Sequence, residues 1–493
     1  MARWIQQSTL LGARRRGATL PAVALSCALA ASVVVPAAAA TAAGTATLAV
    51  PATGGSAAGV SLTNGSLYNV VDQVGARALW ARGFTGRGVN VAIIDTGIAP
   101  VAALSGPGKV VAAVDLTAEA SDPSSAFIDT YGHGTHMAGI IAGEDPGADP
   151  ATAALHPDWF LGVAPDAGIV SVKVGDRTGA VDVTQVIAGV DWVTDHAATL
   201  NIRVLNLSFD SGSTLPYSTD PLDAAIERAW KAGIVVVAPA GNDGRATRHL
   251  GTPANDPYVI AVAAAELKNN DKKWKVPNWV TTGDGVRNPD LSAPGTSIVS
   301  LRDPGSTVDQ MHPEGFASVN LFKGTGSSQA AAVISGTAAL LLSARPSLTP
   351  DQVKQVLIDS ADGKAITPKA AAKSGSGLVQ LTSALTTPVS AAVQAWPLSS
   401  GAGSLDAARG GVFVTVNDQV VQGNVTVFGT PWDGYHWTGF HWTNDVWSGF
   451  HWTDGSWMGY HWTGFHWTGF HWTDATWSSL AWDGYHWTNA GWV

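Results

Sequence analysis

Four short apolar runs, separated by longer segments, are the feature that most constrains the fold of this 493-residue chain. Strands buried on both faces appear as continuous apolar runs, whereas strands with one exposed face alternate apolar and polar residues. The segments between the runs carry helical patterns, which is typical of parallel strands joined by crossover helices. Residues 67–386 are therefore predicted to form an α/β domain, with a parallel sheet covered by helices on both faces. The four runs are Val89–Ile94, Ile169–Val174, Val204–Leu207 and Ile234–Val237.

Two segments of this region carry specific helix signals. One covers residues 221–232, and the other begins after Thr349. Thr349 is a good N-cap residue, and Pro350 follows at the first helical position, where its missing N–H costs no hydrogen bond. Gln352 completes a capping-box pattern. The sequence therefore predicts one helix over residues 221–232 and another that starts at Pro350.

The first 43 residues differ in composition from the rest of the chain. Three consecutive arginines, Arg14–Arg16, precede an apolar run from Leu20 to Val35, and residues 37–43 offer small-residue cleavage sites. This order is typical of an export signal. A transmembrane anchor is the alternative, but the run is short and rich in alanine. We therefore expect an exported protein, either secreted or held at the cell surface.

Cysteine content and charge restrict the chemistry and the partners of the chain. Cys27, the single cysteine, lies within the predicted signal. The processed chain therefore cannot form disulfides, and its stability must come from packing or bound ions. The net charge is −10, and it becomes −14 when residues 1–43, with four arginines and no acidic residue, are removed. Because this balance repels phosphates, we expect no nucleic-acid partner.

Segments of simpler composition flank the predicted α/β domain. Residues 44–66, rich in Gly, Ala, Ser and Thr, are expected to be a short pro-segment or linker. Residues 387–411, rich in Pro, Ser, Ala and Gly, are predicted to be a second linker. Residues 412–428 alternate apolar and polar side chains, which predicts a small β-hairpin.

Tryptophan recurs every five residues, thirteen times without interruption, between Trp432 and Trp492. A fixed period indicates that each unit performs the same structural role. A period of five aligns side chains in neither a plain strand nor a plain helix, so short extended pieces joined by turns are expected. Because disorder is associated with few aromatic residues, residues 429–493 are predicted to form a small β-rich repeat module.

The role of residues 429–493 has several interpretations. The first is a self-packing structural appendage, since aromatic side chains bury much apolar surface. The second is contact with a cell wall or polysaccharide through ring stacking, and the third is self-association. The recurring histidines suggest a metal-binding tract as a fourth interpretation. They show no pattern typical of a zinc site, which disfavours that one.

Three polar residues of the α/β region are suited to be an acid, a base and a nucleophile. Asp95 ends the first apolar run, at the edge of the sheet where open α/β folds build their sites. His133 lies between two glycines, which let the backbone pack tightly around its imidazole. Ser328 begins a helical run of small residues, whose N-terminus favours a developing oxyanion. Their order along the chain matches one of the known serine-hydrolase arrangements.

Each of these residues has a plainer interpretation when it is taken alone. Asp95 could cap a turn, Ser328 could be a simple N-cap, and Ser327 is the alternative nucleophile. His136 is expected to be a buried or supporting residue. Asn242 follows an apolar strand, and its amide could donate a hydrogen bond to a tetrahedral oxyanion. The ordered set, rather than any single residue, predicts acyl transfer by a serine.

Residues 67–386 resemble the subtilisin family (S8) of serine peptidases in the segments Val91–Gly97, Gly132–His136 and Gly326–Ser328. The resemblance implies a serine endopeptidase that cleaves protein or peptide substrates through an acyl-enzyme. It implies no cofactor for the chemistry. Structural calcium is common in the family, but no acidic loop of this sequence specifies a site. The resemblance assigns the acid to Asp95, the base to His133, the nucleophile to Ser328 and the oxyanion donor to Asn242.

The same resemblance implies a pocket for the substrate side chain next to the cleaved bond. A glycine at its floor, Gly251, implies a roomy pocket for a large apolar or aromatic side chain. Asp210 stands beside the pocket where the family usually has glycine, which implies a preference for basic residues nearby in the substrate. The predicted pocket residues are Ser208, Phe209, Ala240, Gly241 and Gly251.

The chain departs from the family pattern after the nucleophile. Gln329 replaces a methionine, and Ala332 replaces a proline. The loss of the proline is expected to loosen the start of the helix, which bears on efficiency rather than on the reaction. The alternative function is a catalytically silent surface adhesin, which would use the protease fold and the repeat only for binding. The presence of all four proposed active-site residues favours the peptidase.

Overall fold

The computed structural model describes residues 62–268, 271–367, 371–391, 393–416, 419–432 and 434. The predicted signal, most of the 44–66 segment and nearly all of the 429–493 repeat therefore lie outside the described residues. The predictions made for those segments stay predictions.

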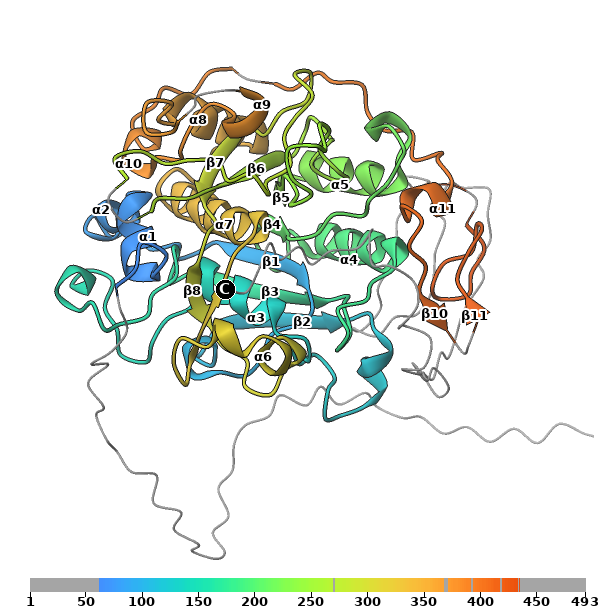
Figure 1. The fold of residues 1–493 in the computed structure, drawn as a ribbon, viewed down its shortest axis with the longest axis horizontal. Helices are drawn as coiled ribbons and strands as arrows, with labels where there is room; N and C mark the ends of the chain where they lie inside the picture. Colours follow the sequence, from blue (N-terminus) through green and yellow to red (C-terminus); the bar gives the residue numbers. More distant parts are fainter. Residues whose placement is uncertain are drawn as a thin grey trace, which may run out of the picture. The chain divides into compact units, whose positions relative to one another are not determined.

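A seven-stranded sheet with the order β2-β3-β1-β4-β5-β6-β7 forms the centre of the domain (Figure 1). Every pair of neighbouring strands is parallel, which confirms the predicted parallel sheet. A separate antiparallel pair, β8 with β9, precedes helix α7. The strands are β1 Asn90–Asp95, β2 Val110–Asp115, β3 Gly168–Lys173, β4 Ile202–Leu207, β5 Val235–Pro239, β6 Ile260–Ala265, β7 Leu291–Pro294, β8 Ile298–Leu301 and β9 Leu321–Gly324.

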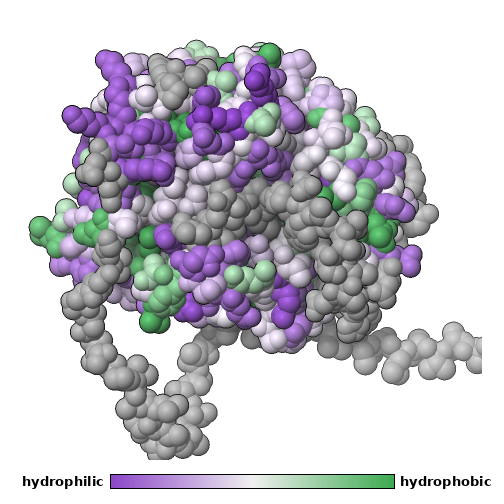
Figure 2. All heavy atoms as spheres, viewed as in Figure 1, coloured by the Kyte–Doolittle hydropathy of each residue, from purple (hydrophilic) through white to green (hydrophobic). Residues whose placement is uncertain are grey.

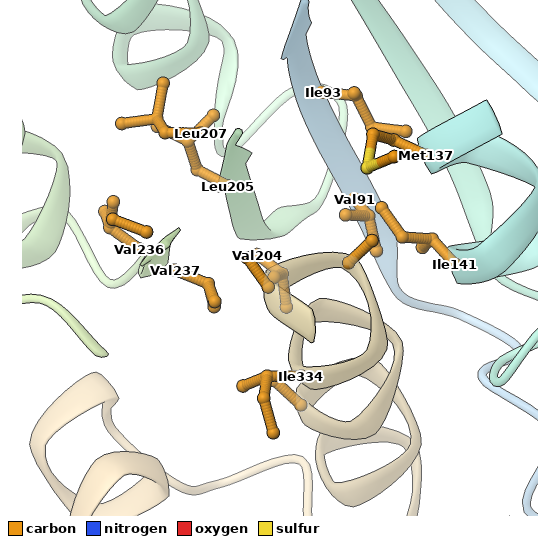
Figure 3. Packing of buried hydrophobic residues seen from close by; sticks show 14 of the residues in the cluster. Val91, Ile93, Met137, Ile141, Val204, Leu205, Leu207, Val236, Val237 and Ile334 are labelled. Carbon is orange, nitrogen blue, oxygen red and sulfur yellow. The ribbon is translucent and has the colours of Figure 1, made fainter. Parts of the chain in front are cut away.

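Helices cover both faces of this sheet, as predicted. Alternate residues of a strand point to opposite faces. Ile93 of β1 lies close to Met137 of α3 in Figure 3, whereas Ile94 lies next to Gly189 of α4. Helix α7 packs against α3, and α4 packs against α5. The helices are α1 Leu67–Gln73, α2 Ala76–Trp80, α3 His133–Ala142, α4 Val183–His196, α5 Pro221–Lys231, α6 Thr307–Met311, α7 Ser327–Ala344, α8 Pro350–Ser360, α9 Ala371–Ser374, α10 Leu381–Ala384 and α11 Leu405–Ala408.

The two predicted helices form with the caps that their sequences specify. Helix α8 has the complete capping box: Thr349 accepts from the N–H of Gln352, and the Gln352 side chain accepts from the N–H of Thr349. Helix α5 begins at Pro221 after Asp220, whose carboxylate accepts from the N–H of Leu222 at 2.8 Å.

Helix α7 is long and apolar enough to cross a membrane, but 89% of it is buried inside the domain. It is therefore the core helix of a packed domain. It lies among strand residues such as Val204 and Val237, which Figure 3 shows around Ile334. On the face shown in Figure 2, the described surface is mostly hydrophilic, and its hydrophobic residues form small separate groups.

The segment 387–411 differs from the expected linker, because its second half packs onto the domain. Leu405 and Ala408 of α11 belong to the main hydrophobic core. The Arg409 guanidinium is fully buried, and its Nε donates to Asp182 at 2.8 Å. Asp182 is the N-cap residue of α4. A composition rich in small residues therefore does not prevent this segment from anchoring the C-terminal part of the chain.

Beyond α11, the predicted hairpin contains a short antiparallel pair, β10 Thr415–Val416 with β11 Gln419–Val420. The first tryptophan of the repeat, Trp432, packs against the core, and its backbone N–H donates to Asn424 O at 2.8 Å.

A cluster of buried carboxyl groups lies around α5. Asp223 and Glu227 of this helix are fully buried with Asp256, and neither oxygen of Asp223 has a hydrogen-bond partner among the described residues. Burial raises the pKa of Asp223 well above its usual value, and the charges of Asp220, Asp256 and Glu227 raise it further, while Arg287 opposes them. Burial also raises the pKa of Asp220, to about 6. The folded protein therefore holds protons here that the unfolded chain loses near pH 4.

These raised pKa values predict a loss of stability as the pH rises. The protonated carboxyl groups contribute fully to the free energy of unfolding below about pH 4. This contribution decreases as the pH rises from there towards the folded-state pKa values. We expect Asp223→Asn, which stays neutral, to make this decrease shallower by up to about 1.4 kcal/mol per pH unit. Urea unfolding at several pH values between about 5 and 8 measures the slope.

The matched control for this prediction is Asp359→Asn, which removes the same charge from an exposed position of α8. It should keep the slope of the wild-type protein. Equal slopes for wild type and Asp223→Asn would contradict the assignment of a buried, protonated carboxyl at position 223.

Candidate active site

Asp95 and His133 form a buried pair at the carboxyl edge of the sheet. Asp95 is the last residue of β1, and His133 is the first residue of α3. The imidazole Nδ1 lies 2.9 Å from Oδ1 and 3.0 Å from Oδ2 of the carboxylate. Oδ1 also accepts from the N–H of Thr96 at 2.8 Å. Burial raises the pKa of Asp95, while the neighbouring His133 and the Thr96 N–H lower it.

The glycines beside His133 are required by the close approach of α3 to the end of β1. A Cβ on Gly134 would overlap the carbonyl oxygen of Gly97. Gly132, on the other side, has a φ of 109°, which favours glycine. The pattern around His133 therefore reflects the packing that holds the imidazole against Asp95.

Asp129 orients this corner of the site, and the sequence analysis did not identify it. Its Oδ1 accepts from Thr96 Oγ1 at 2.8 Å and from the N–H of Gly132 at 2.7 Å. Its Oδ2 accepts from the N–H and the hydroxyl of Thr135 at 2.8 and 2.7 Å. Asp129 thus ties the start of α3 to the turn after Asp95. An acidic residue just before a helical run is a capping signal that could have revealed it.

His136, expected to be a supporting residue, is buried in α3 one turn after His133. Burial lowers its pKa to about 3, and the proximity of His133 adds to this effect. His136 is therefore neutral, and it can support the packing of α3 without adding a charge to the site.

Ser328 and its neighbour Ser327 have different contacts at the start of α7. The Ser328 hydroxyl donates to Ser208 O, the residue that follows β4, at 3.1 Å. The Ser327 hydroxyl donates to Asn242 Oδ1 at 2.9 Å, and it accepts from the N–H of Gly241 at 3.2 Å. The alternative nucleophile is therefore occupied in positioning Asn242. Ser328 needs a rotation of its hydroxyl away from Ser208 before it can donate to an imidazole.

Asn242 is held in one orientation by Ser327. Its Oδ1 accepts from both the N–H and the hydroxyl of Ser327, each at 2.9 Å. Because the backbone N–H can only donate, it identifies the atom that faces Ser327 as the oxygen. The Nδ2 donor is consequently directed to the other side of the amide.

The predicted pocket residues follow adjacent strands of the sheet. Ser208 and Phe209 come directly after β4, and Ala240 and Gly241 come directly after β5. Contacts with Ser328 and Ser327 place both segments beside the start of α7. A Cβ on Gly251, the predicted floor, would overlap the Asp210 carboxylate.

Within the part of the chain that the structure describes, no group of three or more His, Cys, Asp or Glu side chains is arranged to hold a metal ion. The expectation of structural calcium stays a prediction.

Comparisons with known proteins agree with this fold and its motifs. The model of the Subtilase family (peptidase S8) matches residues 86–395. Serine protease AprX of Bacillus subtilis is 34% identical over 289 residues, which cover 56% of this chain and 62% of the relative. Subtilisin E of Bacillus subtilis is 33% identical over 294 residues, which cover 59% and 65%. The chain thus spans less than two thirds of the length of these relatives.

A solved structure is similar as well. Fervidolysin from Fervidobacterium pennivorans, a keratinolytic enzyme related to subtilisin, has a TM-score of 0.51 and 26% sequence identity. The match covers 65% of this chain and 46% of fervidolysin. With the family model matching more than half of the chain, these findings establish that the chain belongs to the subtilase family of serine peptidases.

Proposed function

We propose that this chain is an exported serine endopeptidase that uses Asp95, His133 and Ser328 as its catalytic triad. The observation that carries the proposal is the buried Asp95–His133 pair at the end of β1. The start of α7 lies at the same edge of the sheet, since the Ser328 hydroxyl donates at 3.1 Å to Ser208 O, directly after β4, the strand next to β1. These contacts support a triad at the carboxyl edge, where parallel sheets carry their sites.

In the proposed mechanism, Ser328 attacks the carbonyl carbon of a peptide bond while His133 takes the hydroxyl proton. Asp95 holds the imidazole with its protonated Nδ1 toward the carboxylate, and it stabilises the imidazolium that forms. His133 then gives the proton to the leaving amine, which breaks the C–N bond and leaves an acyl-enzyme. Water, deprotonated by His133, hydrolyses this ester and restores the serine.

Two donors are available for the oxyanion of the tetrahedral intermediate. The first is Nδ2 of Asn242, whose orientation Ser327 sets. The second is the N–H of Ser328, because the first N–H groups of a helix have no acceptor within the helix. The positive end of the α7 dipole adds to their effect.

The substrates that we propose are proteins or peptides, by similarity to the family. For residues 429–493 we propose a structural or attachment role, with a cell wall or polysaccharide as the attachment partner. Incubating residues 429–493 and the full chain with insoluble polysaccharides and cell walls tests the attachment role. If residues 429–493 bind none of these materials, the structural role is the one that remains for them.

Labelling with a fluorophosphonate probe tests the peptidase directly. We expect the full chain without its first 43 residues to bind one probe molecule covalently. Casein hydrolysis should be lost at the rate at which the probe is bound. Peptide mapping should place the adduct on Ser328. A protein that is folded but neither labels nor hydrolyses casein would instead support the silent adhesin.

A variant of Asn242 tests the oxyanion assignment. We expect Asn242→Ala to lower kcat by about 10²–10³ with a small change in KM, the loss that follows removal of the corresponding donor in subtilisin, a member of this family. Initial rates on a peptide nitroanilide measure both constants. A large increase in KM at unchanged kcat would show that Asn242 binds the ground state and the transition state equally.

A further inference from the structure

The segments after β4 and β5 border the place where a substrate side chain would lie. Ser208 O contacts the Ser328 hydroxyl, and Gly241 and Asn242 contact Ser327. An acyl carbon bonded to Ser328, with its oxygen toward Asn242, therefore lies between residues 208–212 and 240–242. The side chain on the acyl side of the cleaved bond enters the crevice between the ends of these two strands.

Asp210 lies in the segment after β4, and its carboxylate is directed at Gly251. The N–H of Ser211 donates to Thr252 O at 2.9 Å, which joins the segment after β4 to Gly251–Thr252. A Cβ built on Gly251 would overlap both carboxylate oxygens of Asp210. The carboxylate therefore occupies the space above the floor glycine, where a substrate side chain would end.

Among the described residues, the groups that act on this carboxylate are a backbone N–H and a second acid. Its Oδ1 accepts from the N–H of Gly212 at 2.8 Å. None of the ion pairs among the described residues includes Asp210 or Asp243. Burial raises the pKa of Asp210 to about 7, and the negative charge of Asp243 adds to the rise. Arg245, the first basic residue after Asp243, donates to Val276 O instead.

An apolar side chain in the crevice would cover the carboxylate and remove its remaining water. Burying an unpaired carboxylate is costly, whereas a guanidinium or ammonium group would neutralise it and donate hydrogen bonds to its oxygens. We propose that Asp210 makes this peptidase selective for arginine or lysine on the acyl side of the cleaved bond. The proposal rests on the peptidase function proposed above, and it replaces the expectation of a large apolar residue at this position.

Two peptide nitroanilides that differ only in arginine or phenylalanine before the cleaved bond test this proposal. We expect the wild-type kcat/KM to be at least about tenfold higher for arginine at pH 8. Asp210→Asn keeps the shape of the side chain and should lower the arginine-to-phenylalanine ratio by about 100-fold. Asp359→Asn, the same charge change on exposed α8, should keep the wild-type ratio.

The pH dependence separates a charge effect from a structural one. As Asp210 loses its proton around pH 7, the wild-type ratio should rise, because the carboxylate attracts the cationic side chain only when it is ionised. The ratio of Asp210→Asn should stay flat over the same range. A wild-type preference for phenylalanine, or a ratio that Asp210→Asn leaves unchanged, would overturn the proposal.

Equilibrium binding keeps this test independent of the chemistry. Product peptides that end in arginine or phenylalanine are titrated into Ser328→Ala by calorimetry, with and without Asp210→Asn. If the arginine peptide binds more tightly and this preference depends on Asp210, the result supports the proposal. It does so even if the wild type hydrolyses neither nitroanilide. The missing hydrolysis would then count against the peptidase function alone. Equal binding of the two peptides would overturn the selectivity.

Discussion

Replacing Ser328 with alanine is expected to lower kcat for peptide hydrolysis by about 10⁶-fold, the size of the loss when the serine is removed from subtilisin itself. The variant keeps Asn242 and the helix terminus, so the remaining rate above that of water comes from binding and oxyanion contacts. Fluorophosphonate uptake should vanish at the same time. Hydrolysis of a peptide nitroanilide, with protein concentration taken from absorbance, measures the rate.

Ser327→Ala is the matched control, because it removes a hydroxyl one residue away. Its loss frees Asn242 Oδ1 from one of two contacts, while the Ser327 N–H still donates. We expect labelling to persist and kcat to fall by about tenfold, since one of the contacts that position the oxyanion donor is lost. Labelling that survives in Ser328→Ala but disappears in Ser327→Ala would reverse the assignment of the nucleophile.

Replacing Asp95 with asparagine is the second large expected effect, a decrease in kcat of about 10⁴-fold near neutral pH. Both carboxylate oxygens of Asp95 lie within 3.0 Å of His133 Nδ1. An amide at this position can donate to Nδ1, which stabilises the tautomer whose Nε2 carries the proton and cannot accept one from Ser328. The imidazolium also loses its buried counter-charge. Steady-state kinetics over a range of pH measures the effect.

Asp359→Asn again serves as the comparison, as an exposed carboxylate of α8 replaced by its amide. Unfolding curves of both variants establish that they are folded. An Asp95→Asn enzyme that retains more than about a tenth of the wild-type kcat would exclude Asp95 from the triad.

Local sequence signals predicted much of the sheet and two of its helices. β1, β3, β4 and β5 are mostly apolar, and their burial on both faces follows from this composition. The capping box of α8 needs only residues that are adjacent in the chain. Three other strands were harder to identify: β2 is largely exposed, β6 is rich in alanine, and β7 has four residues and ends in proline.

The sequence also indicated the candidate triad, because each member lies at or next to the end of an element that its own neighbours specify. Asp95 closes a strand, His133 opens a helix between glycines, and Ser328 lies in the first turn of a helix of small residues. Their order along the chain then restricted the interpretation to one family.

Other features were decided only when the whole domain packed. The support of α3 by Asp129, the contact of Ser327 with Asn242 and the carboxyl cluster around Asp223 join residues from different elements. The same holds for Asp210 above Gly251, where a glycine alone had suggested an open pocket. Such contacts depend on the register of the strands and on the angles at which the helices cross. The packing of the entire core determines both, so no short stretch of the chain specifies these contacts.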